Sequence, residues 1–176
     1  MNVEMASPLA AKHLLAIAQQ IQKDASAIFL PPEEGQQAES QNVIPLSVVR
    51  NTRGYIESIA NQANGCYHRG WFDACAVMVR RLVETVIIEA YEHHSIAAKI
   101  QKNGDFLYLR DLISSALSEP AWNLSRNTKA ALPRLKDIGD KSAHSRRFNA
   151  HRRDLDSVRD DVRVVVQEFM YLAALK

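Results

Sequence analysis

The segment from Trp71 to His94 constrains the fold most, because it is the only helical stretch of the chain that is apolar almost all the way round. At about 100° per residue, its apolar side chains cover two adjoining faces and part of the back. A helix with so little polar surface belongs in the protein interior. The segment therefore predicts a buried central helix with these apolar positions: Trp71, Phe72, Cys75, Val77, Met78, Val79, Leu82, Val83, Val86, Ile87, Ile88 and Ala90.

The polar residues Asp73, Arg80 and Glu84 form one stripe on this helix, about 40° wide. An unpaired buried charge costs several kcal/mol, so the stripe must face either a solvent slot or polar partners on a neighbouring segment. One interpretation is a surface ion pair between Arg80 and Glu84, worth a few tenths of a kcal/mol. The apolar surroundings favour a polar network of Arg80, Glu84 and Asp140, in which Glu84 bonds to the turn after Asp140 and orients His144.

The composition indicates one globular domain of ordinary size. The chain has 176 residues, of which 47% are hydrophobic and 24% are charged, close to the average for globular proteins. The formal net charge of +2 provides no global field that indicates nucleic acid or excludes it. Any electrostatic interpretation must therefore rest on local clusters of charge.

Cysteine usage and the hydrophobic stretches predict a cytoplasmic protein with no membrane segment. Cys66 and Cys75 have neither metal-site spacing nor C-x-x-C spacing, which predicts buried free thiols. The N-terminus lacks a basic region followed by an apolar run. The most apolar stretch, near the C-terminus, is short and is interrupted by Gln167 and Glu168.

The chain is expected to divide at about residue 44. Residues 1–44 should hold an N-terminal helix, from Pro8 to Phe29, and a polar, partly acidic loop that cannot bury enough surface to order itself. Residues 45–176 should form the helical domain. A flexible connection leaves open whether the first helix packs on its own chain or on a second subunit.

The helical domain should begin with a long amphipathic helix. Pro45 suits its first turn, and its apolar rhythm continues to Tyr67. Asn64-Gly65 and Arg69-Gly70 supply stop and turn signals. The short link predicts that this helix and the central helix are antiparallel neighbours.

The second half of the chain predicts three more helices. Asp105 can cap a helix that buries Phe106, and Ser125 can cap another, which Pro133 kinks or divides. The last helix should begin within residues 149–154 and run to the C-terminus. No stretch alternates as a strand does, and no internal repeat occurs. The predicted fold is an all-α, compact bundle of five to seven helices.

The connection before the last helix holds the densest charge. Residues 136–153 contain two histidines, four arginines and two lysines, a density that can bind phosphate. His144 or His151 is available there for proton transfer near neutral pH. The alternative is a solvated basic loop without a ligand. The candidate nucleic-acid-binding residues are Lys141, Arg146, Arg147, Arg152 and Arg153.

The sequence predicts neither a metal nor a cofactor. His93 and His94 point about 100° apart on a helix, and no H-E-x-x-H or Cys-His spacing links them to His144 or His151. The isolated glycines form no phosphate loop and no G-x-S-x-G turn. Nucleotide-hydrolase and esterase functions are therefore excluded.

Three short motifs occur in an order that resembles a known family: a Tyr-x-x-Gly turn (Tyr67, Gly70), Arg80-x-x-x-Glu84, and the run from Ile138 to His144. Over about residues 45–175 this order is similar to domain-of-unknown-function family 4145. That family resembles the HEPN superfamily (higher eukaryote and prokaryote nucleotide-binding) of helical bundles, many of them dimeric, found alone or attached to restriction-type defence enzymes. The resemblance implies a helical dimer in prokaryotic defence.

The resemblance also implies candidate catalytic residues. Active ribonucleases of that superfamily carry Arg, four residues and then His at the start of the last helix, and two such motifs meet across a dimer. His144 matches this His, and Gly139 stands at the Arg position. Arg146 and His151 have the same spacing one turn later. His144, Arg146 and His151 are therefore the candidates.

The sequence and the resemblance together leave three alternative functions. The first is a HEPN-like dimer that binds nucleic acid or a defence-system protein partner without catalysis. The second is a metal-independent endoribonuclease with His144 as acid or base and Arg146 or Lys141 as the phosphate-binding cation. The third is a structural assembly domain. A homodimer would cover the apolar excess of the central and last helices and place residues 141–153 near the two-fold axis.

Overall fold

The computed structural model describes residues 15–21 and 42–176. Residues 15–21 are helical, and the side chains of Leu15, Ile17 and Ile21 are exposed. The remainder of the expected N-terminal helix, and residues 31–41 of the polar loop, lie outside the described residues. Residues 42–176 belong to one compact unit.

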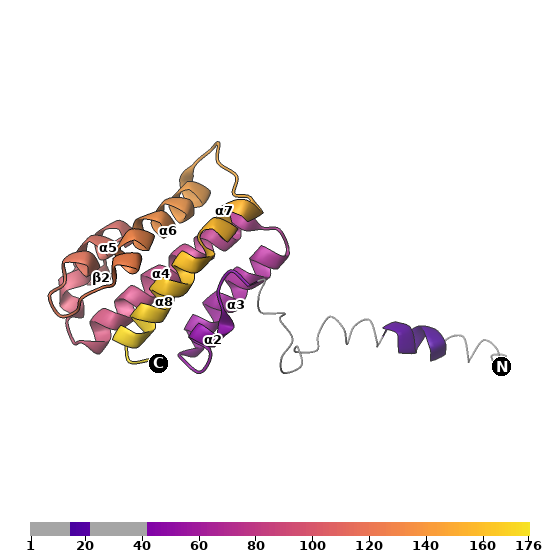
Figure 1. The fold of residues 1–176 in the computed structure, drawn as a ribbon, viewed down its shortest axis with the longest axis horizontal. Coiled ribbons are helices and arrows are strands. Elements are labelled where there is room, and N and C mark those ends of the chain that lie inside the picture. Colours follow the sequence, from indigo (N-terminus) through magenta and orange to yellow (C-terminus); the bar gives the residue numbers. More distant parts are fainter. Residues whose placement is uncertain (1–14, 22–41) are drawn as a thin grey trace. The chain divides into compact units, whose positions relative to one another are not determined.

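Within residues 42–176 the chain is helical apart from one small hairpin (Figure 1). The elements are α2 (Leu46–Val49), α3 (Gly54–His68), α4 (Phe72–His93), the 3-10 helix η2 (Ala97–Ile100), β1 (Gln101–Lys102), β2 (Asp105–Phe106), α5 (Leu109–Ser118), α6 (Arg126–His144), α7 (Arg152–Ser157) and α8 (Arg159–Leu172). The predicted all-α bundle is confirmed.

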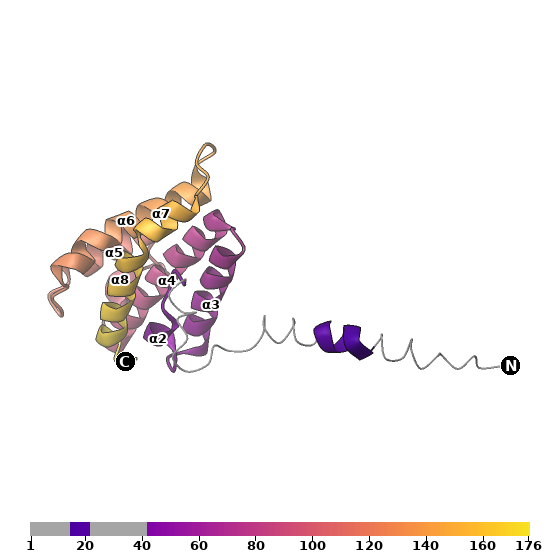
Figure 2. The same cartoon turned by 45° about the vertical axis from the view of Figure 1, so that its right-hand side comes forward.

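The central helix of this bundle is α4. It packs against α3, α6 and α8, and Figures 1 and 2 show α3 and α6 on different sides of it. Its buried apolar side chains all belong to one hydrophobic core, and Glu89 is its one buried charged residue. The prediction of a buried central helix is therefore confirmed, with these residues buried: Cys75, Ala76, Val79, Leu82, Val83, Val86, Ile87, Glu89, Ala90 and Tyr91.

The turn between α3 and α4 explains why Trp71 is not buried. Gly70 adopts φ +77°, its N–H donates to the carbonyl of Tyr67 at 3.1 Å, and the Trp71 N–H donates to the carbonyl of Cys66 at 2.9 Å. These two bonds close α3 in a Schellman motif. Trp71 therefore lies outside α4 and is 59% exposed. Gly65, predicted as part of the stop signal, lies inside α3.

The expected long helix from Pro45 to Tyr67 is two helices, α2 and α3. The chain breaks at Asn51, which adopts φ 62°, a left-handed conformation that Asn tolerates and that ends helices. Buried Asn64 of α3 ties down the preceding segment, because its amide oxygen accepts from the Ile44 N–H and its Nδ2 donates to the Ile44 carbonyl, both at 2.9 Å.

A hairpin replaces the start of the helix that was expected at Asp105. Asn103 and Gly104 adopt φ 56° and 91°, as the two central residues of a type I′ turn do. Asp105 then pairs with Lys102 in the antiparallel ladder of β1 and β2. The prediction that Asp105 caps a helix is wrong, and Phe106 is 38% exposed instead of buried.

The boundaries of α6 and α7 set the geometry of the basic stretch. Ser125 caps α6 as predicted, since its Oγ accepts from the Thr128 N–H at 3.2 Å. Because Pro133 lies on the exposed side of α6, the helix continues through it to His144. The last predicted helix begins at α7 and is divided from α8 at Val158.

Both cysteines are free thiols, as predicted, but only Cys75 is buried and Cys66 is half-buried. Burial and the neighbouring Cys66 raise the pKa of Cys75 to about 12. None of the helices within residues 15–21 and 42–176 is long and apolar enough to cross a membrane.

Candidate nucleic-acid interface

The polar stripe of α4 faces α6 and the connection that follows it. Arg80 Nε donates to Asp140 Oδ1 at 2.8 Å, and Lys136 Nζ donates to Asp140 Oδ2 at 2.6 Å. In the first turn of α4, Asp73 Oδ1 accepts from the Ala150 N–H at 3.0 Å. Arg80 and Asp140 thus meet in one polar cluster, and Asp140 is its centre.

Gly139 allows α6 to approach α4 at this cluster. A Cβ atom at position 139 would lie 2.6 Å from Cβ of Arg80 and 3.0 Å from its Cδ. Cβ of Arg80 is attached to the backbone, so the overlap could be relieved only by moving one helix away from the other. The absent side chain of Gly139 is therefore what lets Arg80 cross α6 and reach Asp140.

Glu84 lies at the edge of the cluster and does not orient His144. Its carboxylate is 3.8 Å from Arg80 Nη1, and its side chain is 32% exposed. His144 is exposed, and its imidazole forms no hydrogen bond to Glu84 or to any other residue of the described ranges. The reason is that α6 stays helical beyond Asp140, so His144 lies at its last residue instead of in a turn beside Glu84.

The charge of Asp140 is stabilised by its two cationic partners. Burial raises the pKa of its carboxyl group, whereas hydrogen bonds from Lys136 and Arg80, and the charges of both, lower it by more. The net pKa of Asp140 lies below its ordinary value. The carboxylate is therefore a permanent anion of this cluster at neutral pH.

The predicted basic residues occupy three settings, so the expectation of one loop over residues 136–153 is wrong. Residues 136–144 are helical, and we call residues 145–151 the basic connection. Figure 1 shows it standing out at one end of the bundle. Lys141 and His144 lie in the last turn of α6, Arg146 and Arg147 in the basic connection, His151 directly before α7, and Arg152 and Arg153 at the start of α7.

The second half of the basic connection is anchored to the bundle. Phe148 is half-buried against the hydrophobic core, and the Ala150 N–H is held by Asp73 of α4. The His151 N–H donates to Asp154 Oδ2 at 2.8 Å, which closes the first turn of α7. Only the residues before Phe148 project without such support.

Most cations of the stretch already have protein partners. Lys141 and Arg153 pair with neighbouring aspartates at 2.6 Å and 3.9 Å, and Arg152 contacts an aromatic cluster. Arg146 and Arg147 are exposed, and their side chains have no hydrogen bond or ion pair to any residue that the structure describes. These two guanidinium groups are therefore the ones available to an external anion.

Arg152 joins α7 to the end of α3 through buried Tyr67. The Tyr67 hydroxyl accepts from Arg152 Nη1 at 3.0 Å and from Arg159 Nη2 at 2.9 Å, and donates to Asp156. The Arg152 guanidinium lies 4.6 Å from the centroid of the Tyr67 ring. Burial and the Asp156 bond raise the pKa of Tyr67, and the charges of both arginines oppose that rise.

Sequence reasoning missed this cluster. Arg152 is predicted as a nucleic-acid ligand, but the structure engages it with Tyr67, and neither Asp156 nor Arg159 is among the predicted residues. The Tyr-x-x-Gly turn marks Tyr67, but its arginine partners are 85 and 92 residues away. No local pattern reports a contact over that separation.

The four candidate histidines lie in two separate places. His93 and His94 lie at the end of α4, whereas His144 ends α6 and His151 is the last residue of the basic connection. Within residues 15–21 and 42–176, no group of three or more His, Cys, Asp or Glu side chains is arranged to hold a metal ion.

Comparisons with protein-family models, with curated proteins and with solved structures find no match. The resemblance to the HEPN superfamily therefore stays a prediction.

The lowered pKa of Asp140 predicts how acid weakens the fold. Its folded value lies below the unfolded value of about 3.9, so its contribution is present above pH 3.9 and is lost as the pH falls through the folded value. Asp140→Asn should reduce the free energy of unfolding by about 1 kcal/mol at pH 7. In urea titrations the difference from wild type should shrink below about pH 4.

The matched control is Asp137→Asn, because Asp137 pairs with Lys141 at 2.6 Å but its side chain is 60% exposed. This variant should change the free energy of unfolding by less than about 0.5 kcal/mol. A loss in Asp140→Asn that stays constant from pH 7 to about pH 3 would show that the carboxylate charge is irrelevant.

Proposed function

We propose that this protein is a HEPN-like helical module that binds nucleic acid through the basic connection and does not cleave it. The observation that carries the proposal is the pair of exposed guanidinium groups of Arg146 and Arg147, which have no partner among the described residues. In an otherwise ion-paired stretch, these groups can bind phosphate without first breaking an internal contact.

Guanidinium chemistry supports phosphate as the ligand. An arginine fork donates two parallel hydrogen bonds to one phosphate and stays charged at any physiological pH. Adjacent arginines on a short connection, anchored at Phe148 and by Asp73, can contact successive phosphates of one strand. Contacts of this kind provide affinity and salt dependence without reading the base sequence.

The environment of Gly139 supports a function without catalysis. Active ribonucleases of the HEPN superfamily, which the sequence resembles, carry their arginine at this position. Here even a methyl group would collide with the stem of Arg80, so an arginine at position 139 would require a different packing of α6 on α4. Arg80, the nearby arginine, is engaged in a structural hydrogen bond to Asp140.

A metal-independent endoribonuclease is the second candidate. It is favoured by the exposed imidazole of His144, which is free of hydrogen bonds within the described ranges and lies two residues from Arg146. Lys141, the other candidate cation, is held by Asp137 at 2.6 Å. A purely structural assembly domain, with a solvated basic connection, is the third candidate.

The central prediction concerns Arg146 and Arg147. Changing both to Glu should abolish the salt-sensitive part of RNA binding, because two cations that contact phosphate become repulsive anions. Fluorescence anisotropy with a mixed pool of labelled RNA, at several salt concentrations, measures this loss. An unchanged affinity would place the binding elsewhere.

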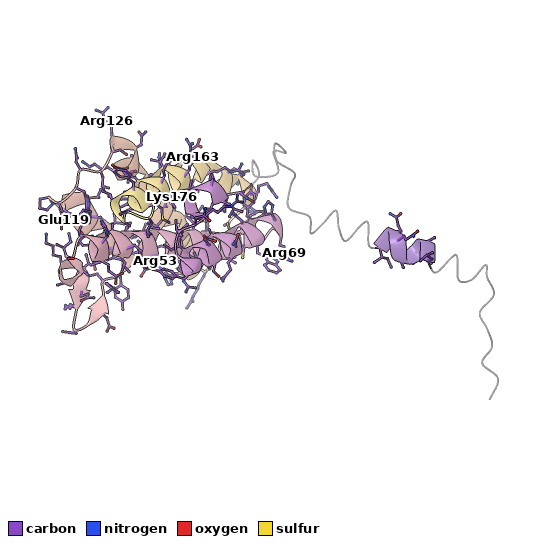
Figure 3. The ribbon with its side chains drawn as sticks, turned by 90° about the horizontal axis from the view of Figure 1, so that it is seen from below. Arg53, Arg69, Glu119, Arg126, Arg163 and Lys176 are labelled. Atoms are coloured by element: carbon purple, nitrogen blue, oxygen red, sulfur yellow. The ribbon has the colours of Figure 1, made fainter. Side chains whose placement is uncertain are left out.

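Arg110→Glu combined with Arg126→Glu is the control, since it changes the net charge equally at exposed positions on α5 and at the start of α6. Arg126 lies about 27 Å along α6 from its last residue, at the other end of the bundle from Arg69 in Figure 3. This control should keep most of the affinity. Chelator-resistant cleavage of the RNA, lost in His144→Ala, would replace this proposal with the ribonuclease.

We also propose that the protein acts as a homodimer in prokaryotic defence, with RNA or a defence-system protein as its partner. The support is the resemblance alone, because the apolar residues of α4 and α8 that motivated a dimer in the sequence are already buried in the core of one chain. A two-fold axis near the basic connection would double its local positive charge. Light scattering at micromolar concentration should give twice the 19.8 kDa chain mass, and a monomer would contradict the proposal.

A further inference from the structure

An open groove runs between α3 and α4, and its volume is about 830 Å³. Its two ends differ in charge: Glu57 lies at the start of α3, whereas Arg69 and Trp71 lie at the turn into α4. Between them, the α3 wall carries polar side chains such as Asn61 and Gln62, and the α4 wall carries apolar ones such as Val77 and Met78. The Trp71 end is therefore the one suited to a ligand that is both planar and anionic.

The Schellman turn holds Trp71 at the mouth of this groove. The main-chain bond from the Trp71 N–H to Cys66 is made within the turn itself, and Gly70 supplies the left-handed residue. The Arg69 guanidinium carbon lies 5.7 Å from the centroid of the indole ring, within the range of a cation–π contact. Trp71 as a whole is nevertheless 59% exposed.

The start of α4, directly after Trp71, contacts the anchored end of the basic connection and the start of α7. Asp73, two residues after Trp71, holds the Ala150 N–H at 3.0 Å. Arg152 lies 5.7 Å from the ring centroid of Phe72, the residue next to Trp71. Arg69 also lies at the rim of the bundle in Figure 3. A strand whose phosphates contact Arg146 and Arg147 would therefore pass close to the exposed indole.

We infer that Trp71, supported by Arg69, is a stacking platform for an unpaired base of single-stranded RNA bound along the basic connection. The inference rests on the proposed function and specifies its ligand as single-stranded. Every nucleobase has an aromatic face, so stacking on Trp71 adds affinity without sequence preference. Arg69 adds a cation beside the indole for the phosphate of the same nucleotide. Glu57 disfavours the strand farther along the groove.

The test compares an oligouridylate of about a dozen nucleotides with an abasic oligomer of the same length and charge, by anisotropy on full-length protein. The wild type should bind the oligouridylate more tightly. Trp71→Ala should lower that affinity roughly five- to 150-fold, the range measured for one stacked base, and remove the difference between the two oligomers. The salt dependence should stay the same, since no phosphate contact is removed.

Tyr108→Ala is the matched control, because Tyr108 is an 82% exposed aromatic residue before α5, and it should bind both oligomers as the wild type does. Trp71→Phe should keep part of the preference for the base-bearing oligomer. Tryptophan fluorescence provides a second readout, in which Trp71 is kept. For this measurement Trp122→Phe removes the other tryptophan, which packs against Tyr91. The remaining emission of Trp71 should be quenched by oligouridylate and not by the abasic oligomer.

The outcomes separate the two proposals. Equal binding of both oligomers, unchanged in Trp71→Ala and without quenching of Trp71, would overturn the stacking platform and leave the phosphate-binding function standing. Failure of the wild type to bind either oligomer would overturn both. If Trp71→Ala does not fold, as circular dichroism would show, the quenching experiment alone decides, and absence of quenching overturns the platform.

Discussion

The structure depends on the close approach of α6 to α4 at Gly139. There the stem of Arg80 occupies the space where any other residue would place its Cβ, at 2.6 Å. This contact lets Arg80 reach Asp140 at 2.8 Å, and Asp140 in turn holds Lys136. A polar stripe on an otherwise buried helix would be costly if it were unpaired. Because α6 lies so near, Arg80 of the stripe is paired with Asp140 and this contact joins the two helices.

The contact between α4 and α6 also positions the basic connection, the candidate interface. The basic connection begins after His144, the last residue of α6, so the packing of α6 on α4 sets its starting point. Asp73, on the same polar stripe of α4, accepts a hydrogen bond from the Ala150 N–H near the other end of the connection. Arg152 and Arg159 then clamp Tyr67, which closes α7 and α8 onto the end of α3. The turn after Tyr67 leaves Trp71 exposed, two residues before Asp73. The polar contacts that stabilise the bundle thus also position the connection that carries Arg146 and Arg147, whose side chains have no partner among the described residues.

The parts of this arrangement that depend on local patterns could be predicted from the sequence. The apolar periodicity of α4 and the capping position of Ser125 are examples, and so is the need for a partner to the Arg80 stripe. The break at Asn51 depends on one left-handed residue and the hairpin on two, Asn103 and Gly104, and periodicity does not reveal them. The clamp on Tyr67 joins residues more than 80 positions apart, so only the folded chain shows it.

The most direct measurement of the central claim compares Gly139→Ala with Gly65→Ala. Both glycines lie inside helices, and each change gains about 1 kcal/mol of helix propensity, but a Cβ at Gly65 meets nothing within 4 Å. Chemical denaturation should show Gly139→Ala less stable than Gly65→Ala by about 1 to 3 kcal/mol, the usual cost of overpacking. Equal stability of the two variants would contradict the account, because it would mean that α6 and α4 do not depend on close contact at this residue.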